Sequence, residues 1–117
     1  MNKKLAEQER AENSLRNEVE QLDRQISDYD KCLELNQKQI DGAKDKTDLL
    51  KERQTLLQKE YDVSTQRVDT MTKALEECRN ETGENSEEYR QLENELSDAK
   101  IKQQDLKNSI QDTTEEL

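Results

Sequence analysis

The feature that most constrains this chain is a seven-residue repeat of apolar residues that runs from Leu5 to Leu117 without a change of phase. About two thirds of the residues at the first and fourth positions of the repeat are apolar, although apolar residues make up only 28% of the chain. A period of 3.5 residues places these side chains along one seam of an α-helix that packs beside another helix. The repeat therefore predicts an all-α fold of coiled-coil type.

The composition leaves few alternatives to long helices. Charged residues make up 41% of the chain, which has no Pro, no Phe and two Gly. So little apolar surface cannot offset the entropy lost in building an ordinary globular core. Disordered chains of similar polarity usually carry Pro and Gly, whereas Glu, Lys, Gln, Leu and Arg, which dominate here, are good helix formers. We therefore expect residues 1–117 to form a single helical coiled-coil segment.

Two short stretches could reverse the chain. The first is 41–46, which contains Gly42, and Asp45 or Thr47 could cap the helix that follows. The second is 80–86, where Gly83 suits a helix C-terminus and Asn85, followed by Glu88, resembles the start of a capping box. These breaks predict helices over about 3–41, 47–81 and 86–116, folded back as an antiparallel hairpin or an elongated three-helix bundle.

An extended, kinked coiled coil is the alternative arrangement. It would span roughly 175 Å at about 1.5 Å per residue, whereas folded-back helices of about 40 residues would span about 60–70 Å. A parallel dimer is disfavoured, because more of its flanking charge pairs repel than attract. The attractive pairs are Lys4–Glu9 and Glu95–Lys100, and the repulsive ones are Glu18–Asp23, Lys46–Lys51, Glu88–Glu93 and Lys102–Lys107.

Folding back brings complementary seam residues together. Leu33 then faces Leu57 and Met71 faces Leu96, while polar residues face each other. The predicted polar contacts are Ser64 with Gln103, and a layer of Asn36, Gln54 and Thr113. Two contacts fit badly, namely Ile26 with Ser64 and Glu12 with Cys78. Tyr29, Tyr61 and Tyr89 also lie on the seam, where core positions are expected.

A second apolar stripe accompanies the seam in the middle of the chain. Leu35, Leu49, Leu56 and Val63 occupy the same position of successive repeats, with Gly42 between the first two. Extra apolar surface beside a seam predicts a second neighbouring helix there, and these four residues are the candidate protein-interaction site. Isolated surface leucines are the alternative explanation.

Several functional classes lack a signal in the sequence. The formal charge of −10 disfavours binding to nucleic acid or to an anionic membrane, and no apolar run has the length of a membrane span or follows Lys3–Lys4 as a leader peptide would. The chain has no His, and we expect no catalytic, metal or cofactor site. We expect the carboxylates of Glu76–Glu77, Glu87–Glu88 and Glu115–Glu116 to be solvated. Cys32 and Cys78 match no metal or redox spacing and are expected at the edge of the core.

Two segments resemble helical parts of the tail tape-measure proteins of long-tailed bacteriophages. One is the stretch from Lys46 to Leu57, with its Thr-Asp-Leu-Leu start, and the other runs from Gly83 to Leu96 around Ser-Glu-Glu-Tyr-Arg-Gln-Leu. In that family a Leu-rich helix ends in a short loop and restarts with such a run. The first loop here departs from the family, because it lacks the Pro often found there and carries Asp41-Gly42 instead.

The resemblance covers about residues 19–110, and it implies a fragment of a longer, non-enzymatic protein. Such proteins occupy the tail lumen during virion assembly and set the tail length, so the implied location is the virion and the implied partners are tail assembly proteins or further copies of the chain. The alternative is a cellular coiled-coil tether or spectrin-like spacer in the cytoplasm that binds a protein partner through the Leu35–Val63 stripe.

Overall fold

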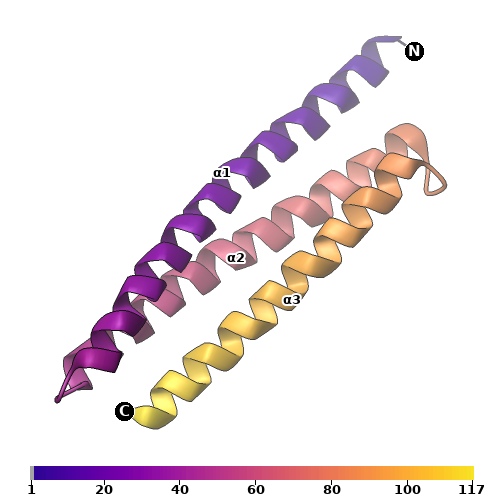
Figure 1. Ribbon diagram of the computed structural model, residues 1–117. Helices are drawn as coiled ribbons and strands as arrows, with labels where there is room; N and C mark the ends of the chain where they lie inside the picture. Colours follow the sequence, from indigo (N-terminus) through magenta and orange to yellow (C-terminus); the bar gives the residue numbers. More distant parts are fainter. Residues whose placement is uncertain (1) are drawn as a thin grey trace.

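The computed structural model of the chain contains three α-helices joined by two short loops (Figure 1). They are α1 (Asn2–Gly42), α2 (Thr47–Thr82) and α3 (Glu87–Glu116). The structure describes the backbone of residues 2–117 and the side chains of residues 7, 10, 11 and 13–117. Predictions for the side chains of Leu5, Gln8 and Glu12 lie outside the described residues. Residues 2–117 include no strand, which confirms the all-α fold.

The chain folds back at both predicted breaks, so that α2 runs antiparallel to α1 and α3 (Figure 1). The backbones of α1 and α3 each pack along α2, but they do not approach each other closely. The Cα atoms extend over 66 × 20 × 17 Å, a length in the range expected for folded-back helices and far below that of an extended rod. The middle helix therefore has two neighbours within the chain, as the second apolar stripe predicted.

The turn between α2 and α3 depends on Gly83 and Ser86. Gly83 has φ +83° and ψ 166°, a combination that essentially only glycine adopts, and its N–H donates to the carbonyl of Arg79 over 2.9 Å. Ser86 caps α3, because its Oγ accepts a hydrogen bond from the N–H of Tyr89 over 3.0 Å. The predicted cap at Asn85 was therefore wrong by one residue.

The turn between α1 and α2 has a simpler geometry. Helix α1 continues through Gly42, which does not adopt a positive φ. Asp45 Oδ1 accepts a hydrogen bond from the N–H of Thr47 over 3.0 Å, and this hydrogen bond lowers the pKa of Asp45. The N-cap of α2 is Lys46, whose side chain makes no capping hydrogen bond, so neither Asp45 nor Thr47 is the cap; Asp45 instead holds the first N–H of the helix from one residue before it.

The apolar core forms three clusters along the bundle. Near the turn between α2 and α3, Met71 packs with Leu96 and Ala99. In the middle, Val63 of α2 packs with Leu22 and Ile26 of α1. The third cluster joins one leucine from each helix, and its members are Leu33, Leu57 and Leu106. The predicted contacts of Leu33 with Leu57 and of Met71 with Leu96 thus fall within shared clusters.

The polar contacts differ from the prediction in their partners. Gln54 donates to Thr114, one residue beyond Thr113, and Gln103 donates to Thr65 instead of Ser64; both hydrogen bonds measure 3.0 Å. Both threonine hydroxyls donate to a carbonyl of their own helix, but Thr113 is buried whereas Thr114 is exposed, and the Gln54 amide donates to the exposed one.

Asn36 makes a further unpredicted contact. It is buried, and its Nδ2 donates to the backbone carbonyl of Leu49 over 3.1 Å. The predicted layer of Asn36, Gln54 and Thr113 therefore does not form as a set of mutual side-chain contacts. Of these three residues, only Gln54 bonds next to its predicted partner, whereas Asn36 bonds to the backbone of Leu49 and Thr113 to that of Ser109.

Candidate functional site

The residues of the predicted interaction stripe do not share one open surface. Leu35 projects from α1 and is 59% exposed, whereas Val63 is buried against Leu22 and Ile26. Leu56 is half-buried against the cluster around Leu57, and Leu49 is half-buried near the end of the bundle. Most of the stripe therefore contributes to packing within the chain, and a role in binding a separate partner stays a prediction.

A cluster of charged residues lies where the three helices meet, and each helix contributes one member. Glu60 of α2 is fully buried, with 0% of its surface exposed. Its Oε2 lies 3.3 Å from Nζ of Lys102 in α3, and the same Nζ lies 3.1 Å from Oδ1 of Asp30 in α1. Two carboxylates thus share one ammonium group, which links all three helices at one level.

Burial strongly favours the neutral form of Glu60. The pKa of Glu60 is raised to about 7, and desolvation is the largest cause. The hydrogen bond and the charge of the neighbouring Asp30 act in the same direction, whereas Lys102 opposes the shift. For Lys102, burial alone would lower the pKa, but the hydrogen bond to Asp30 and the charge of Glu60 raise it overall. Glu60 can therefore carry a proton near neutral pH while Lys102 stays charged.

The charged cluster contains a buried carboxylate, Glu60, which the sequence pattern did not single out. Glu60 and Lys102 occupy position g of the repeat and Asp30 occupies position e, which flank the seam and often carry interhelical charge pairs. Charged residues at these positions could therefore be recognised in the sequence. Which of them form ion pairs becomes clear only when positions e and g are paired across the antiparallel register of three helices.

The cysteines and tyrosines also differ in burial. Cys78 is completely buried, and its Sγ lies 3.4 Å from Oγ1 of Thr82. Cys32 is exposed, so the expectation that it lies at the edge of the core was wrong. The three tyrosines, Tyr29, Tyr61 and Tyr89, are half-buried at the edges of the helix contacts.

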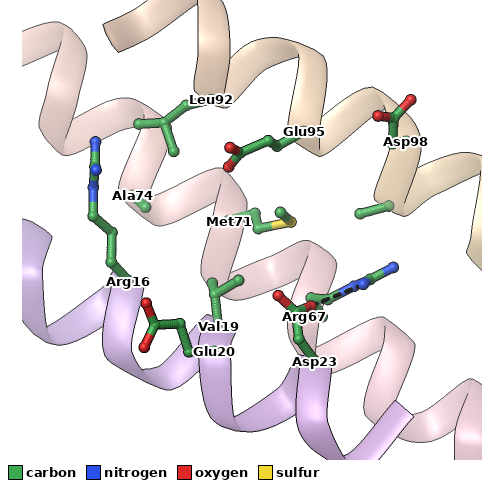
Figure 2. A pocket seen from close by; sticks show the side chains of 11 residues that line it. Arg16, Val19, Glu20, Asp23, Arg67, Met71, Ala74, Leu92, Glu95 and Asp98 are labelled. Atoms are coloured by element: carbon green, nitrogen blue, oxygen red, sulfur yellow. Dashed lines mark hydrogen bonds and ion pairs between the residues drawn. The ribbon is translucent and has the colours of Figure 1, made fainter. Parts of the chain in front are cut away.

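A groove of about 440 Å³ lies near the turn between α2 and α3, and we call it the α1–α3 groove (Figure 2). Met71 and Ala74 of α2 line its floor, Val19 of α1 lines one wall, and Leu92 and Ala99 of α3 line the other. The groove lies between the two outer helices, which both rest on α2 without close contact between their own backbones.

Both arginines of the groove form ion pairs. Nη1 of Arg67 lies 2.9 Å from Oδ1 of Asp23, as the dashed line in Figure 2 shows. Arg16 pairs with Glu88 across the mouth of the groove, from α1 to α3. Beyond these pairs, further acidic residues line the groove on both sides, namely Glu20, Glu95 and Asp98.

Within the described part of the chain, no group of three or more His, Cys, Asp or Glu side chains is arranged to hold a metal ion. None of the helices in the same part is apolar over a long enough stretch to cross a bilayer. No known protein family, curated protein or solved structure matches the chain.

Proposed function

We propose that the chain is a non-enzymatic structural segment of the tape-measure type, which contributes helical length to a longer protein that sets the length of a phage tail. The observation that carries this proposal is the agreement between the helix starts and the resembling segments. Helix α2 begins at Thr47, at the start of the Thr-Asp-Leu-Leu run, and α3 begins at Glu87, directly after the cap at Ser86.

The narrow core supports a role that depends on length. Its apolar clusters each join only a few side chains, and the bundle is 66 Å long but only 20 × 17 Å across. The same residues as one continuous helix would span roughly 175 Å at about 1.5 Å per residue. A segment of this kind can occupy a narrow lumen in a folded or in an extended form.

Tail length in particles from the genome that encodes the chain would test this proposal. In-frame deletion of residues 47–116 removes α2 and α3, and an extended ruler then predicts tails shorter by about 105 Å, at about 1.5 Å per residue. The control is Leu57→Ala, which weakens the core and keeps the number of residues, so it leaves the tail length unchanged. Tails of normal length after the deletion, or the absence of tailed particles, would overturn the proposal.

A spacer or interaction module is the second candidate, and the folded-back shape of the bundle favours it. A 66 Å bundle holds its two ends at a set distance, and Leu35 remains exposed on its surface. This function predicts that Leu35→Asp weakens the binding of a protein partner while the helical content stays constant. A pull-down with the full protein measures this binding. Equal recovery of the partner by the Leu35→Asp variant and by the unchanged protein would contradict this function.

A further inference from the structure

The α1–α3 groove has the shape of a site for part of another helix. On α1 its lining residues include Arg16, Val19 and Asp23, and on α3 they include Leu92, Glu95 and Ala99. Spacings of three, four and seven residues place such side chains on one face of a helix over two turns. The groove therefore runs along the bundle axis between two parallel walls, as Figure 2 shows.

The floor of the groove allows close approach. Ala74 and Ala99 line the groove together with Met71 and carry small side chains. Ala99 occupies a position of the repeat that holds leucine one repeat before and one repeat after it, at Leu92 and Leu106. Methionine is unbranched and flexible, and it adapts to different partner surfaces. An apolar floor with a volume of about 440 Å³ can hold two or three apolar side chains from one face of a docked helix.

The charges around the groove decide which partner fits. Arg16 and Arg67 are already paired with Glu88 and Asp23. No ion pair involves Glu20, Glu95 or Asp98 among the described residues, so the groove has an excess of negative charge. A second copy of the chain fits poorly, because each copy carries a formal charge of −10. Nucleic acid is repelled by the same charge.

We infer that the α1–α3 groove binds a basic amphipathic helix of a protein partner. Apolar residues of that helix, spaced three or four apart, contact Met71 and Ala74, while its Lys or Arg side chains pair with Glu20, Glu95 and Asp98. Such binding does not depend on whether the chain sets a tail length. It adds a protein-recognition site that the apolar stripe of the sequence did not predict.

Methyl NMR of the whole chain tests this inference, because the chain has only two methionines. The probe is an 18-residue peptide of Leu and Lys with its leucines on one helical face, and a Leu/Glu peptide of the same pattern serves for comparison. We expect a saturable shift of the Met71 methyl signal with the Leu/Lys peptide. The Leu/Glu peptide should leave this signal unchanged.

Paired charge reversals separate the groove from general attraction to an acidic protein. The double variant Glu95→Lys and Asp98→Lys should weaken binding of the Leu/Lys peptide by about tenfold or more, because both changes lie at the groove. The control, Glu34→Lys and Glu52→Lys, makes the same charge change at exposed positions near the other end of the bundle, and it should weaken binding by about threefold at most.

Two results would overturn the inference: an unmoved Met71 signal, or equal loss of binding in both double variants. A Met71 shift that depends on protein concentration without peptide would instead assign the groove to a second copy. Circular dichroism of each variant establishes that the helices are intact, so weaker binding cannot be attributed to unfolding.

Discussion

At the level of Leu57 the three helices meet through large side chains, whereas at the level of Met71 small residues leave the α1–α3 groove. The first level joins Leu33, Leu57 and Leu106, and the charged cluster of Asp30, Glu60 and Lys102 ties together the same three helices. We call the part around Leu57 and Glu60 the closed level and the part around Met71 the open level. We therefore expect the closed level to contribute most to stability, and the open level is where we propose that a partner helix binds.

The largest expected effect comes from removing the central leucine of the closed level. Leu57 is 2% exposed, so Leu57→Ala should lower the free energy of unfolding by about 3 kcal/mol, through lost burial and a residual cavity. Urea unfolding followed by circular dichroism measures this change. The matched variant Leu35→Ala, at a 59% exposed position, should change it by about 0.5 kcal/mol or less. Equal effects would contradict the packing described for the closed level.

The second effect is a pH dependence that comes from Glu60. Its pKa is about 7 in the folded chain and 4.5 in the reference state. The folded chain therefore binds this proton more tightly than the unfolded chain does. The contribution of Glu60 to the free energy of unfolding is fully present below about pH 4.5, and it is lost as the pH rises through about 7. The loss amounts to about 3.5 kcal/mol at most, at about 1.4 kcal/mol per unit of pKa. The raised pKa of Lys102 acts above pH 10.5, outside this window.

Substitution by a neutral isostere isolates this contribution. Glu60→Gln should remove most of the difference in unfolding free energy between pH 5 and pH 8, whereas Glu34→Gln, at an exposed position, should leave the difference unchanged. Urea titrations at both pH values measure it. A Glu60→Gln protein that keeps the full pH dependence would mean that the many surface carboxylates, and not the closed level, cause it.

A smaller effect is expected at the end of the open level, where Ser86 caps α3. Ser86→Ala should cost about 1 kcal/mol, because the N–H of Tyr89 loses its acceptor. Hydrogen exchange at residues 87–90 should become faster, since these amides lie in the first turn of α3. Asn85→Ala is the matched control, and an equal acceleration in that variant would favour the cap predicted from the sequence.

The smallest effect concerns the ion pair at the groove. Oδ1 of Asp23 lies 2.9 Å from Nη1 of Arg67, and the side chain of Asp23 is about half exposed. Asp23→Asn should therefore change the free energy of unfolding by about 0.5 kcal/mol or less, because exposed ion pairs contribute little. A loss of several kcal/mol in thermal unfolding would show that the open level holds α1 as firmly as the closed level does.

The sequence predicted the helices and their turns because both are local features. The heptad repeat places Leu33, Leu57 and Leu106 on one seam, and Gly83 marks the second turn through its own backbone preference. The partners of Gln54 and Gln103 were wrong by one residue, since a single heptad frame does not describe the side-chain rotations that choose between Thr113 and Thr114. Such rotations depend on the packing of all three helices together.

Burial beside the seam was harder to predict for the same reason. Leu35 and Val63 occupy the same position of the repeat, yet Leu35 is exposed and Val63 is buried. Helix α2 has neighbours on both sides, so residues flanking its seam become core, whereas those of α1 face solvent. Glu60 was missed because its burial requires neighbours from two other helices, and the sequence pattern describes one helix at a time.

Small-angle X-ray scattering with mass determination tests the central claim, that one chain folds back on itself into a three-helix bundle. We predict a mass of 13.8 kDa for a single chain, a radius of gyration slightly above the 18.2 Å of the Cα atoms, and a maximum dimension close to the 66 Å length of the bundle. A maximum dimension above about 120 Å, as an extended helix of about 1.5 Å per residue would give, would contradict the account, and so would the mass of a dimer.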